Sequence, residues 1–312
     1  MKPEIIVTGR LLPRTQEALD RIFTCHKLYE AADHLAFLRQ HAQQVRALAT
    51  FGASGADAAL MDQLPKLEII SNFGVGVDAI DLAAAAKRRI IVTNTPEVLT
   101  ECVADTAMAL VLATLRRLPQ SENYLRAGQW GTRGAYPLTT SLGGKTLGVL
   151  GLGRIGEAIA KRAEAFGMKL RYHNRSRKNL AWPYEPDVVS LAKNSDVLLV
   201  AAPGGPQTQR IVNAAVLDAL GPQGFVVNIA RGSLIDEPAL LRYLREGRIA
   251  GAGLDVFDNE PKIDPAWFSL DNAVLLPHVG SATEETRTAM GALQVENLQL
   301  HFAGKPVKTP VT

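Results

Sequence analysis

Cysteine, long apolar runs and a strong charge of either sign are all scarce in this sequence, and each shortage excludes a class of protein. Cys25 and Cys102 are too few for a disulfide framework and do not resemble a metal-binding cluster, so we predict no metal site. The longest apolar stretch, residues 107–115, is too short to cross a bilayer, and the N-terminus has no signal-peptide pattern. We therefore expect a cytoplasmic protein without a membrane partner.

The net charge is only +3, from 34 lysine and arginine residues against 31 aspartate and glutamate residues. The basic residues are scattered, and no run of them is interleaved with aromatic residues as a nucleic-acid groove would require. We predict no nucleic-acid partner. A few cations gathered around one small anionic ligand would fit this charge balance equally well.

Short β-branched runs alternate with longer helical patterns, and the alternation occurs in two series. The predicted strands are residues 5–7, 45–49, 67–71 and 90–93 in the first series, and 146–150, 169–173, 197–201, 225–229, 251–255 and 273–276 in the second. Such alternation predicts βαβ units and parallel sheets. Since 312 residues exceed the usual size of a single core, we predict an α/β protein with two doubly wound parallel-sheet domains.

Two long apolar helices, residues 101–118 and 284–302, follow the first and the second series. We interpret them as two crossings between domains. Residues 1–100 and 284–312 would then form a discontinuous, flavodoxin-like substrate-binding domain. A Rossmann-type nucleotide-binding domain, residues 101–283, would be inserted into it, with an active site in the cleft between the two.

A dinucleotide-binding fingerprint joins the predicted strand 146–150 to an amphipathic helix. It has the form G-x-G-x-x-G and consists of Gly151, Leu152, Gly153, Arg154, Ile155 and Gly156. Gly151 permits a tight turn, Gly153 lets the backbone approach a pyrophosphate, and Gly156 lets helix and strand pack closely. The helix N-terminus offers unpaired N–H groups to the anion. The alternative is a glycine-rich turn that only packs, but the strand before and the helix after favour a nucleotide site.

The end of the next predicted strand indicates which dinucleotide binds. An NAD site usually places a carboxylate there, to accept hydrogen bonds from the ribose hydroxyls. Here Asn174, Arg175, Ser176, Arg177 and Lys178 follow the strand, and they bring three cations and a hydroxyl but no acid. A 2′-phosphate favours such partners, so we predict NADP(H). A solvated basic turn is the alternative.

Three polar residues follow successive strands of the second series, namely Arg231, Glu260 and His278, and Asp255 ends one of these strands. The carboxyl ends of parallel strands share one edge of a sheet, so these residues should converge. Arg231 suits the binding of a carboxylate and the polarisation of a carbonyl. His278 suits proton donation, and Glu260 would orient its ring and favour the imidazolium form. Asp255 could accept a hydrogen bond from a nicotinamide carboxamide.

At these residues the sequence closely resembles the D-isomer-specific 2-hydroxyacid dehydrogenase family over nearly its whole length. The resemblance implies Arg231 as the substrate-binding residue, Glu260 as the partner of the histidine and His278 as the proton donor. It also implies that Asp255 and the backbone of Ile229 lie near the nicotinamide, and that residues 152–155 bind the pyrophosphate. The basic turn is similar to that of the glyoxylate, hydroxypyruvate and hydroxyphenylpyruvate reductase branch, which implies NADPH and a homodimer.

The segment from Ser71 to Asp78 resembles the family's substrate loop. Gly74 and Gly76 on either side of Val75 would expose successive backbone N–H groups, a nest suited to a carboxylate, so Val75 and Gly76 are predicted to bind substrate. Phe51 and Gly52 are further candidates. A tight turn that only joins strand to helix is the alternative.

We therefore predict the NADPH-dependent reduction of a small 2-oxo acid to the D-2-hydroxy acid, with glyoxylate, hydroxypyruvate or hydroxyphenylpyruvate as substrate. Two alternatives stay open. The first is an NAD(P)-sensing binding protein of the same fold, and the second is a phosphite- or formate-type dehydrogenase. The lack of an evident peptide-binding surface disfavours the first, and the basic turn disfavours the second.

Overall fold

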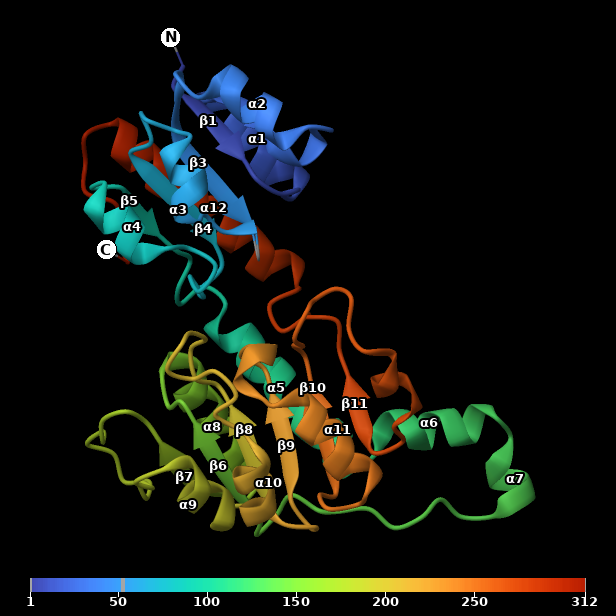
Figure 1. Cartoon of the computed structure of the whole chain (residues 1–312). Helices are drawn as coiled ribbons and strands as arrows, with labels where there is room; N and C mark the ends of the chain where they lie inside the picture. The colour runs from blue at the N-terminus through green and yellow to red at the C-terminus, as the bar shows by residue number, and fades with distance from the viewer. Residues whose placement is uncertain (1, 52–53, 312) are drawn as a thin grey trace. The chain divides into compact units, whose positions relative to one another are not determined.

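The computed structural model describes residues 2–51 and 54–311. The chain divides into two compact units, Met1–Leu99 with Thr283–Thr312 and Thr100–Ala282 (Figure 1). The two connections therefore fall at the starts of the two helices interpreted as crossings. The substrate-binding and nucleotide-binding roles of the two domains stay predictions.

The first unit contains a parallel sheet in the order β2-β1-β3-β4-β5, which is the flavodoxin-like order. Its strands are β1 (Glu4–Val7), β2 (Thr24–Lys27), β3 (Val45–Phe51), β4 (Ile69–Phe73) and β5 (Ile91–Thr93). Its helices are α1 (Pro13–Ile22), η1 (Leu28–Glu30), α2 (His34–His41), α3 (Ala58–Asp62), α4 (Leu82–Lys87) and α12 (Glu284–Phe302). Side chains of α1 and α12 share one apolar core with the sheet, and those of α2, α3 and α4 share another. Burying both faces explains the near-continuous apolar strands.

The second unit contains a parallel sheet in the order β11-β10-β9-β8-β6-β7. Its strands are β6 (Thr146–Leu150), β7 (Lys169–His173), β8 (Val197–Val200), β9 (Phe225–Asn228), β10 (Gly251–Leu254) and β11 (Ala273–Leu275). The order reverses at β6, between β7 and β8, which is the point where open α/β sheets bind ligands. The Rossmann-type strand that would lie beyond β7 is reduced to a single bridge between Tyr172 and Tyr184.

Helices cover both faces of this second sheet. They are α5 (Thr100–Leu115), α6 (Leu118–Arg126), α7 (Gln129–Arg133), α8 (Arg154–Ala165), α9 (Val188–Lys193), α10 (Ala214–Leu220), η3 (Gly232–Leu234), α11 (Glu237–Arg245) and η4 (Pro265–Ser269). The helices α9, α10 and α11 form an apolar core with the sheet. Close packing of α5 requires glycine on β10, because a Cβ at Gly253 would lie 2.4 Å from the hydroxyl oxygen of Thr114.

The structure confirms the predicted fold class, and every predicted strand is present with ends within two residues. Two differences have local causes. The strand β2 was missed because Thr24–Lys27 is a polar edge segment with few apolar residues. The helix predicted over residues 101–118 ends at Leu115, because Arg117 has a φ of 49° and α6 starts afresh at Leu118. Among the described residues, no helix has both the length and the apolarity needed to cross a membrane.

Candidate active site

The glycine turn after β6 has the geometry that its sequence predicts. Gly151 has a φ of 95°, and a Cβ there would lie 2.4 Å from the backbone nitrogen of Ala202. A Cβ at Gly156 would lie 2.4 Å from the carbonyl oxygen of Gly151, so α8 can approach the turn only without a side chain at this position. A Cβ at Gly153 would meet no atom within 4 Å. Gly153 therefore leaves open space beside the backbone at the start of α8.

Asn174, directly after β7, forms a hydrogen bond with the glycine turn. The N–H of Leu152 donates to Oδ1 of Asn174 at 2.6 Å, and the hydroxyl of Tyr184 donates to the Asn174 carbonyl at 3.3 Å. The Leu152 side chain is fully buried. Leu152 and Asn174 thus shape the turn, while Arg154 and Ile155 lie in the first turn of α8, where backbone N–H groups lack acceptors within the helix.

The basic segment beyond β7 is less uniformly cationic than its sequence predicts. Lys178 forms an ion pair with Glu157 on α8, so this cation is already neutralised. Arg175, Ser176 and Arg177 are exposed, and no acidic partner of the two arginines is found among the described residues. Two cations and a hydroxyl therefore stay available to an anion, instead of the three cations expected.

Tyr172, which the sequence did not single out, holds this segment in place. Its side chain is 1% exposed, and its hydroxyl accepts from the Lys178 N–H at 2.9 Å and donates to the Lys178 carbonyl at 3.0 Å. This closes the loop that carries Arg175 and Arg177.

Glu260 and His278 form a hydrogen-bonded pair. Oε2 of Glu260 lies 2.6 Å from Nδ1 of His278, and Oε1 accepts from the Phe257 N–H at 2.9 Å. The pair fixes the ring orientation and leaves Nε2 as the nitrogen able to face a substrate. Burial alone would raise the pKa of Glu260. The hydrogen bonds from His278 and Phe257, with the charges of His278 and Arg231, outweigh burial and lower that pKa.

Asp255 has a structural role that its sequence position did not indicate. Its buried carboxylate accepts from the N–H of Val279 at 2.7 Å and of Gly280 at 2.8 Å, and its carbonyl accepts from the N–H of His278 at 2.9 Å. Burial raises the pKa of Asp255, against the effect of these N–H groups. Asp255 thus holds the backbone that carries His278, whereas its contact with a nicotinamide stays a prediction.

Arg231 follows β9 in a loop that Asn228 shapes. The Asn228 side chain donates to the Arg231 carbonyl at 2.8 Å and accepts from the Ala230 N–H at 3.0 Å. Nη1 of Arg231 donates to the Ala230 carbonyl at 2.6 Å. A Cβ at Gly232 would lie 1.9 Å from the Phe257 carbonyl carbon, so this loop packs directly on the one before Glu260.

Arg231, Glu260 and His278 therefore follow the adjacent strands β9, β10 and β11 at the same edge of the sheet, as their spacing predicts. Ile229 also lies there, at the end of β9 and 9% exposed. Their chemical roles are not tested by this arrangement.

Glu237 supports the loop before Glu260 and was not predicted. Its side chain is buried, accepts from the Asp258 N–H at 2.5 Å and contacts Nε1 of Trp267 at 3.4 Å. Burial raises the pKa of Glu237. In the sequence Glu237 is an ordinary acid in the first turn of a helix, so no local signal indicates this contact.

In the first unit, the loop after β4 leaves a set of N–H groups without partners in the described part of the chain, and this set differs slightly from the predicted nest. The Gly74 N–H donates to the Thr95 hydroxyl at 3.0 Å and is not available. The carbonyls of Gly74 and Gly76 accept from the Asn72 side chain at 3.2 and 2.9 Å, and that of Val75 accepts from Asn94 at 2.9 Å.

In a planar trans peptide the N–H points opposite to the preceding carbonyl. The N–H groups of Val75, Gly76 and Val77 therefore point away from Asn72 and Asn94, and no acceptor for them is found among the described residues. Phe51 lies 5.2 Å from Phe73, ring to ring, and Gly52 lies outside the described residues.

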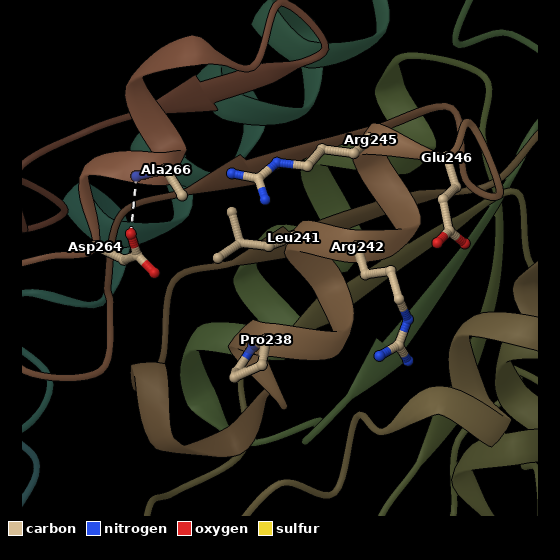
Figure 2. A pocket seen from close by; sticks show the side chains of 7 residues that line it. All are labelled: Pro238, Leu241, Arg242, Arg245, Glu246, Asp264 and Ala266. Carbon is tan, nitrogen blue, oxygen red and sulfur yellow. Dashed lines mark hydrogen bonds between the residues drawn. The ribbon is translucent and has the colours of Figure 1, made fainter.

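A surface hollow of about 460 Å³ lies beside α11 and does not include any of these residues (Figure 2). It is lined by Pro238, Leu241, Arg242, Arg245, Glu246, Asp264 and Ala266. Asp264 is occupied in capping η4 through the Ala266 N–H at 2.8 Å, and the side chains of Arg242 and Arg245 extend in different directions. The hollow does not gather converging polar groups as a substrate site does.

Known proteins resemble the chain over its full length. A family model described as D-isomer specific 2-hydroxyacid dehydrogenase, NAD binding domain, matches residues 108–280. A hydroxyphenylpyruvate reductase from Plectranthus scutellarioides is 49% identical over 297 residues, 95% of each chain. A 2-ketogluconate reductase from Gluconobacter oxydans is 47% identical over 311 residues, 99% of each chain.

A solved structure agrees with these sequence relatives. It is an NADPH-dependent glyoxylate/hydroxypyruvate reductase from Sinorhizobium meliloti in complex with NADP and malonate, and it is 47% identical. The match covers 100% of this chain and 97% of that one, with a TM-score of 0.93.

Proposed function

The chain belongs to the D-isomer specific 2-hydroxyacid dehydrogenase family, and on this basis we propose that it reduces a small 2-oxo acid to the D-2-hydroxy acid with NADPH. The observation that carries the proposal is the pair of Glu260 and His278, which lies in the unit that also contains the glycine turn, with Arg231 close enough to lower the pKa of Glu260. The named relatives are reductases, which favours the enzyme over the sensor or the phosphite- and formate-type alternative.

The residues present fit the cofactor. Gly153 leaves room for a pyrophosphate at the start of α8, and Arg175, Ser176 and Arg177 would hold a 2′-phosphate. Asn174 would keep the turn and this segment in register, and Ile229 would border the nicotinamide. When bound, the cofactor supplies the hydride that the carbonyl carbon receives.

The chain's own residues would bind the substrate and supply the proton. Arg231 would bind the carboxylate and draw charge toward the carbonyl oxygen. In the first unit, the N–H groups of Val75 and Gly76 would offer donors to a carboxylate. As the carbon receives the hydride, Nε2 of His278 gives its proton to that oxygen, which completes the alcohol. Glu260 stabilises the imidazolium before the transfer, and solvent returns the proton afterwards.

A substrate panel tests this proposal. Purified protein is mixed with NADPH or NADH and with glyoxylate, hydroxypyruvate, hydroxyphenylpyruvate or 2-ketogluconate, and the absorbance of the reduced nicotinamide is followed. We expect turnover of at least one acid and a higher kcat/KM with NADPH. The His278→Ala variant should lose most turnover and still bind NADPH. A panel without any turnover would favour the sensor.

Residues 1–100 with 284–312 would bind the substrate and residues 101–283 the NADP, since the N–H nest lies in the first range and the glycine turn in the second. The enzyme would work as a homodimer. Trp130 and Leu138 on the segment around α6 and α7 are 65% and 100% exposed in the single chain, which is unusual for such side chains. Light scattering should report a dimer that Trp130→Asp with Leu138→Asp dissociates.

The compartment would be the cytoplasm. Cys25 and Cys102 are not joined by a disulfide, which is usual where glutathione keeps proteins reduced. Fractionation of the source cells with an antibody to this chain would test the location.

A further inference from the structure

We propose that Glu4, His26 and His41 form a binding site for one divalent transition-metal ion, with Zn²⁺ as the best match. One potential ligand atom from each residue lies within 4.8 Å of the other two. Oε2 of Glu4 is 2.8 Å from Nε2 of His26, and the rings of His26 and His41 stack with centroids 3.8 Å apart. In the described part of the chain this is the one such group found.

Three different elements of the first unit supply the ligands. Glu4 starts β1, His26 lies on the edge strand β2 opposite Ile6, and His41 ends α2. Because side chains alternate along a strand, Glu4, Ile6 and His26 lie on the same face of the sheet. Ile6 belongs to the apolar core that α2 covers, so the three polar groups lie at the margin of that core.

The packing holds these side chains close to one another. Glu4 and His26 have side chains only 27% and 16% exposed. Phe37, one turn before His41 on α2, contacts its ring at 4.8 Å between centroids. Little side-chain freedom has to be lost on metal binding, which favours affinity.

The ligand set suits a borderline metal. Two imidazole nitrogens and one carboxylate oxygen are common zinc ligands, and a water can complete a tetrahedron. With metal–ligand bonds near 2.0–2.1 Å, the ligand atoms of a tetrahedral site lie about 3.3 Å apart. No separation in the present cluster exceeds 4.8 Å, so side-chain rotations have to shorten the longer ones by at most about 1.5 Å and lengthen the 2.8 Å between Glu4 and His26 by about 0.5 Å.

Metal binding would use atoms that are already in contact, because Oε2 of Glu4 and Nε2 of His26 lie 2.8 Å apart. The hydrogen bond between Glu4 and His26 would be replaced by two metal bonds to the same atoms.

The site is separate from the proposed active site. Glu4 is the first residue of β1, whereas the N–H nest follows the last residue of the parallel strand β4. The cluster and the loop after β4 therefore lie at opposite ends of the parallel strands of this sheet. Metal binding would join the edge strand, its neighbour and α2, and so stabilise the first unit.

The alternative is a hydrogen-bonded pair with a stacked ring that only packs, and Co²⁺ and Zn²⁺ titrations of the tag-free full chain distinguish the two. We expect one Co²⁺ per chain with the visible absorption bands of a four- or five-coordinate ion, displaced by Zn²⁺. We also expect Zn²⁺ to raise the Tm. His41→Ala should lower the affinity for the metal ion at least 10- to 100-fold. That is roughly the loss expected for a residue that only hydrogen-bonds to a metal ligand, and His41 would bind the metal directly.

The matched control is His34→Ala, which removes an exposed histidine at the other end of the same helix and should bind as the wild type does. Glu4→Gln keeps the side-chain size and tests the carboxylate if His41→Ala does not fold. Equal Co²⁺ spectra and Zn²⁺ responses in the wild type, His41→Ala and Glu4→Gln would overturn the proposal. So would the absence of any Co²⁺ band in the wild type.

Discussion

Replacing Glu260 by glutamine tests whether the carboxylate charge or only the shape of the site matters. The amide keeps a hydrogen-bond acceptor 2.6 Å from Nδ1 of His278, yet it cannot stabilise an imidazolium electrostatically. A hydrogen bond between charged groups contributes about 1–2 kcal/mol more than a neutral one. We expect kcat/KM for 2-oxo acid reduction to fall about 5- to 30-fold at neutral pH.

The effect on stability should be smaller. The side chains of His278 and Glu260 are 48% and 31% exposed, so solvent screens the pair and the free energy of unfolding should fall by less than about 1 kcal/mol. The folded-state pKa of Glu260 is lowered. Its contribution is therefore present above the usual glutamate pKa of 4.5 and is lost as the pH falls through the lowered value.

The assay is a pH profile of kcat/KM together with urea unfolding. Without the anion the hydrogen bond to His278 is no longer assisted by charge, so kcat/KM should be lower at neutral pH in Glu260→Gln than in the wild type. Glu246→Gln, at an exposed position after α11, serves as the control and should leave the profile unchanged. An unchanged profile and an unchanged kcat/KM in Glu260→Gln would refute the assignment of this pair to proton transfer.

Three further predictions follow from the same contacts. Arg175→Ala with Arg177→Ala should raise KM for NADPH about tenfold and leave KM for NADH within about twofold. The reason is that each charged hydrogen bond contributes about 1.5–3 kcal/mol before solvent screening. Equal effects on both cofactors would contradict the phosphate assignment. Asp255→Asn should lower the free energy of unfolding by about 1.5–3 kcal/mol in urea titrations, because a buried amide cannot accept from both backbone N–H groups well. An unchanged unfolding midpoint would show that other contacts hold the backbone of Val279 and Gly280. Cys25 should resist iodoacetamide at pH 8 in mass spectrometry of the folded chain, because burial, followed by the hydrogen bond with Asp20, raises its pKa to about 12; rapid labelling would argue against that burial.

The strand ends were predictable because their signals are local. A buried parallel strand is a continuous apolar run, and a polar residue directly after it must lie at the carboxyl edge of the sheet. This suffices to bring Arg231, Glu260 and His278 to adjacent strands. The positions of Gly151 and Gly156 were equally predictable, since each answers a steric requirement of the turn itself.

The contacts between distant side chains were not predictable from one sequence. Lys178 pairs with Glu157 across 21 positions, and Trp267 contacts Glu237 across 30. No spacing rule relates such pairs. The same holds for Glu4, His26 and His41, whose spacing along the chain does not resemble a metal motif. Only the fold brings these three residues together, so the sequence alone predicts no metal site.

Two residues at the strand ends explain how a half-exposed site keeps its geometry. Asn228 ends β9 and Asp255 directly follows β10, and both are 1% exposed. Each uses its side chain on backbone N–H or carbonyl groups of the site loops, at Ala230 and Arg231 in one case and at Val279 and Gly280 in the other. A buried polar group left without its partner costs about 1–3 kcal/mol. Moving either loop would leave Asn228 or Asp255 in that state, so these two buried side chains stabilise the loop conformations. The backbone beneath Arg231 and His278 is therefore fixed independently of these two side chains, and Glu260 adds the contact that orients the His278 ring.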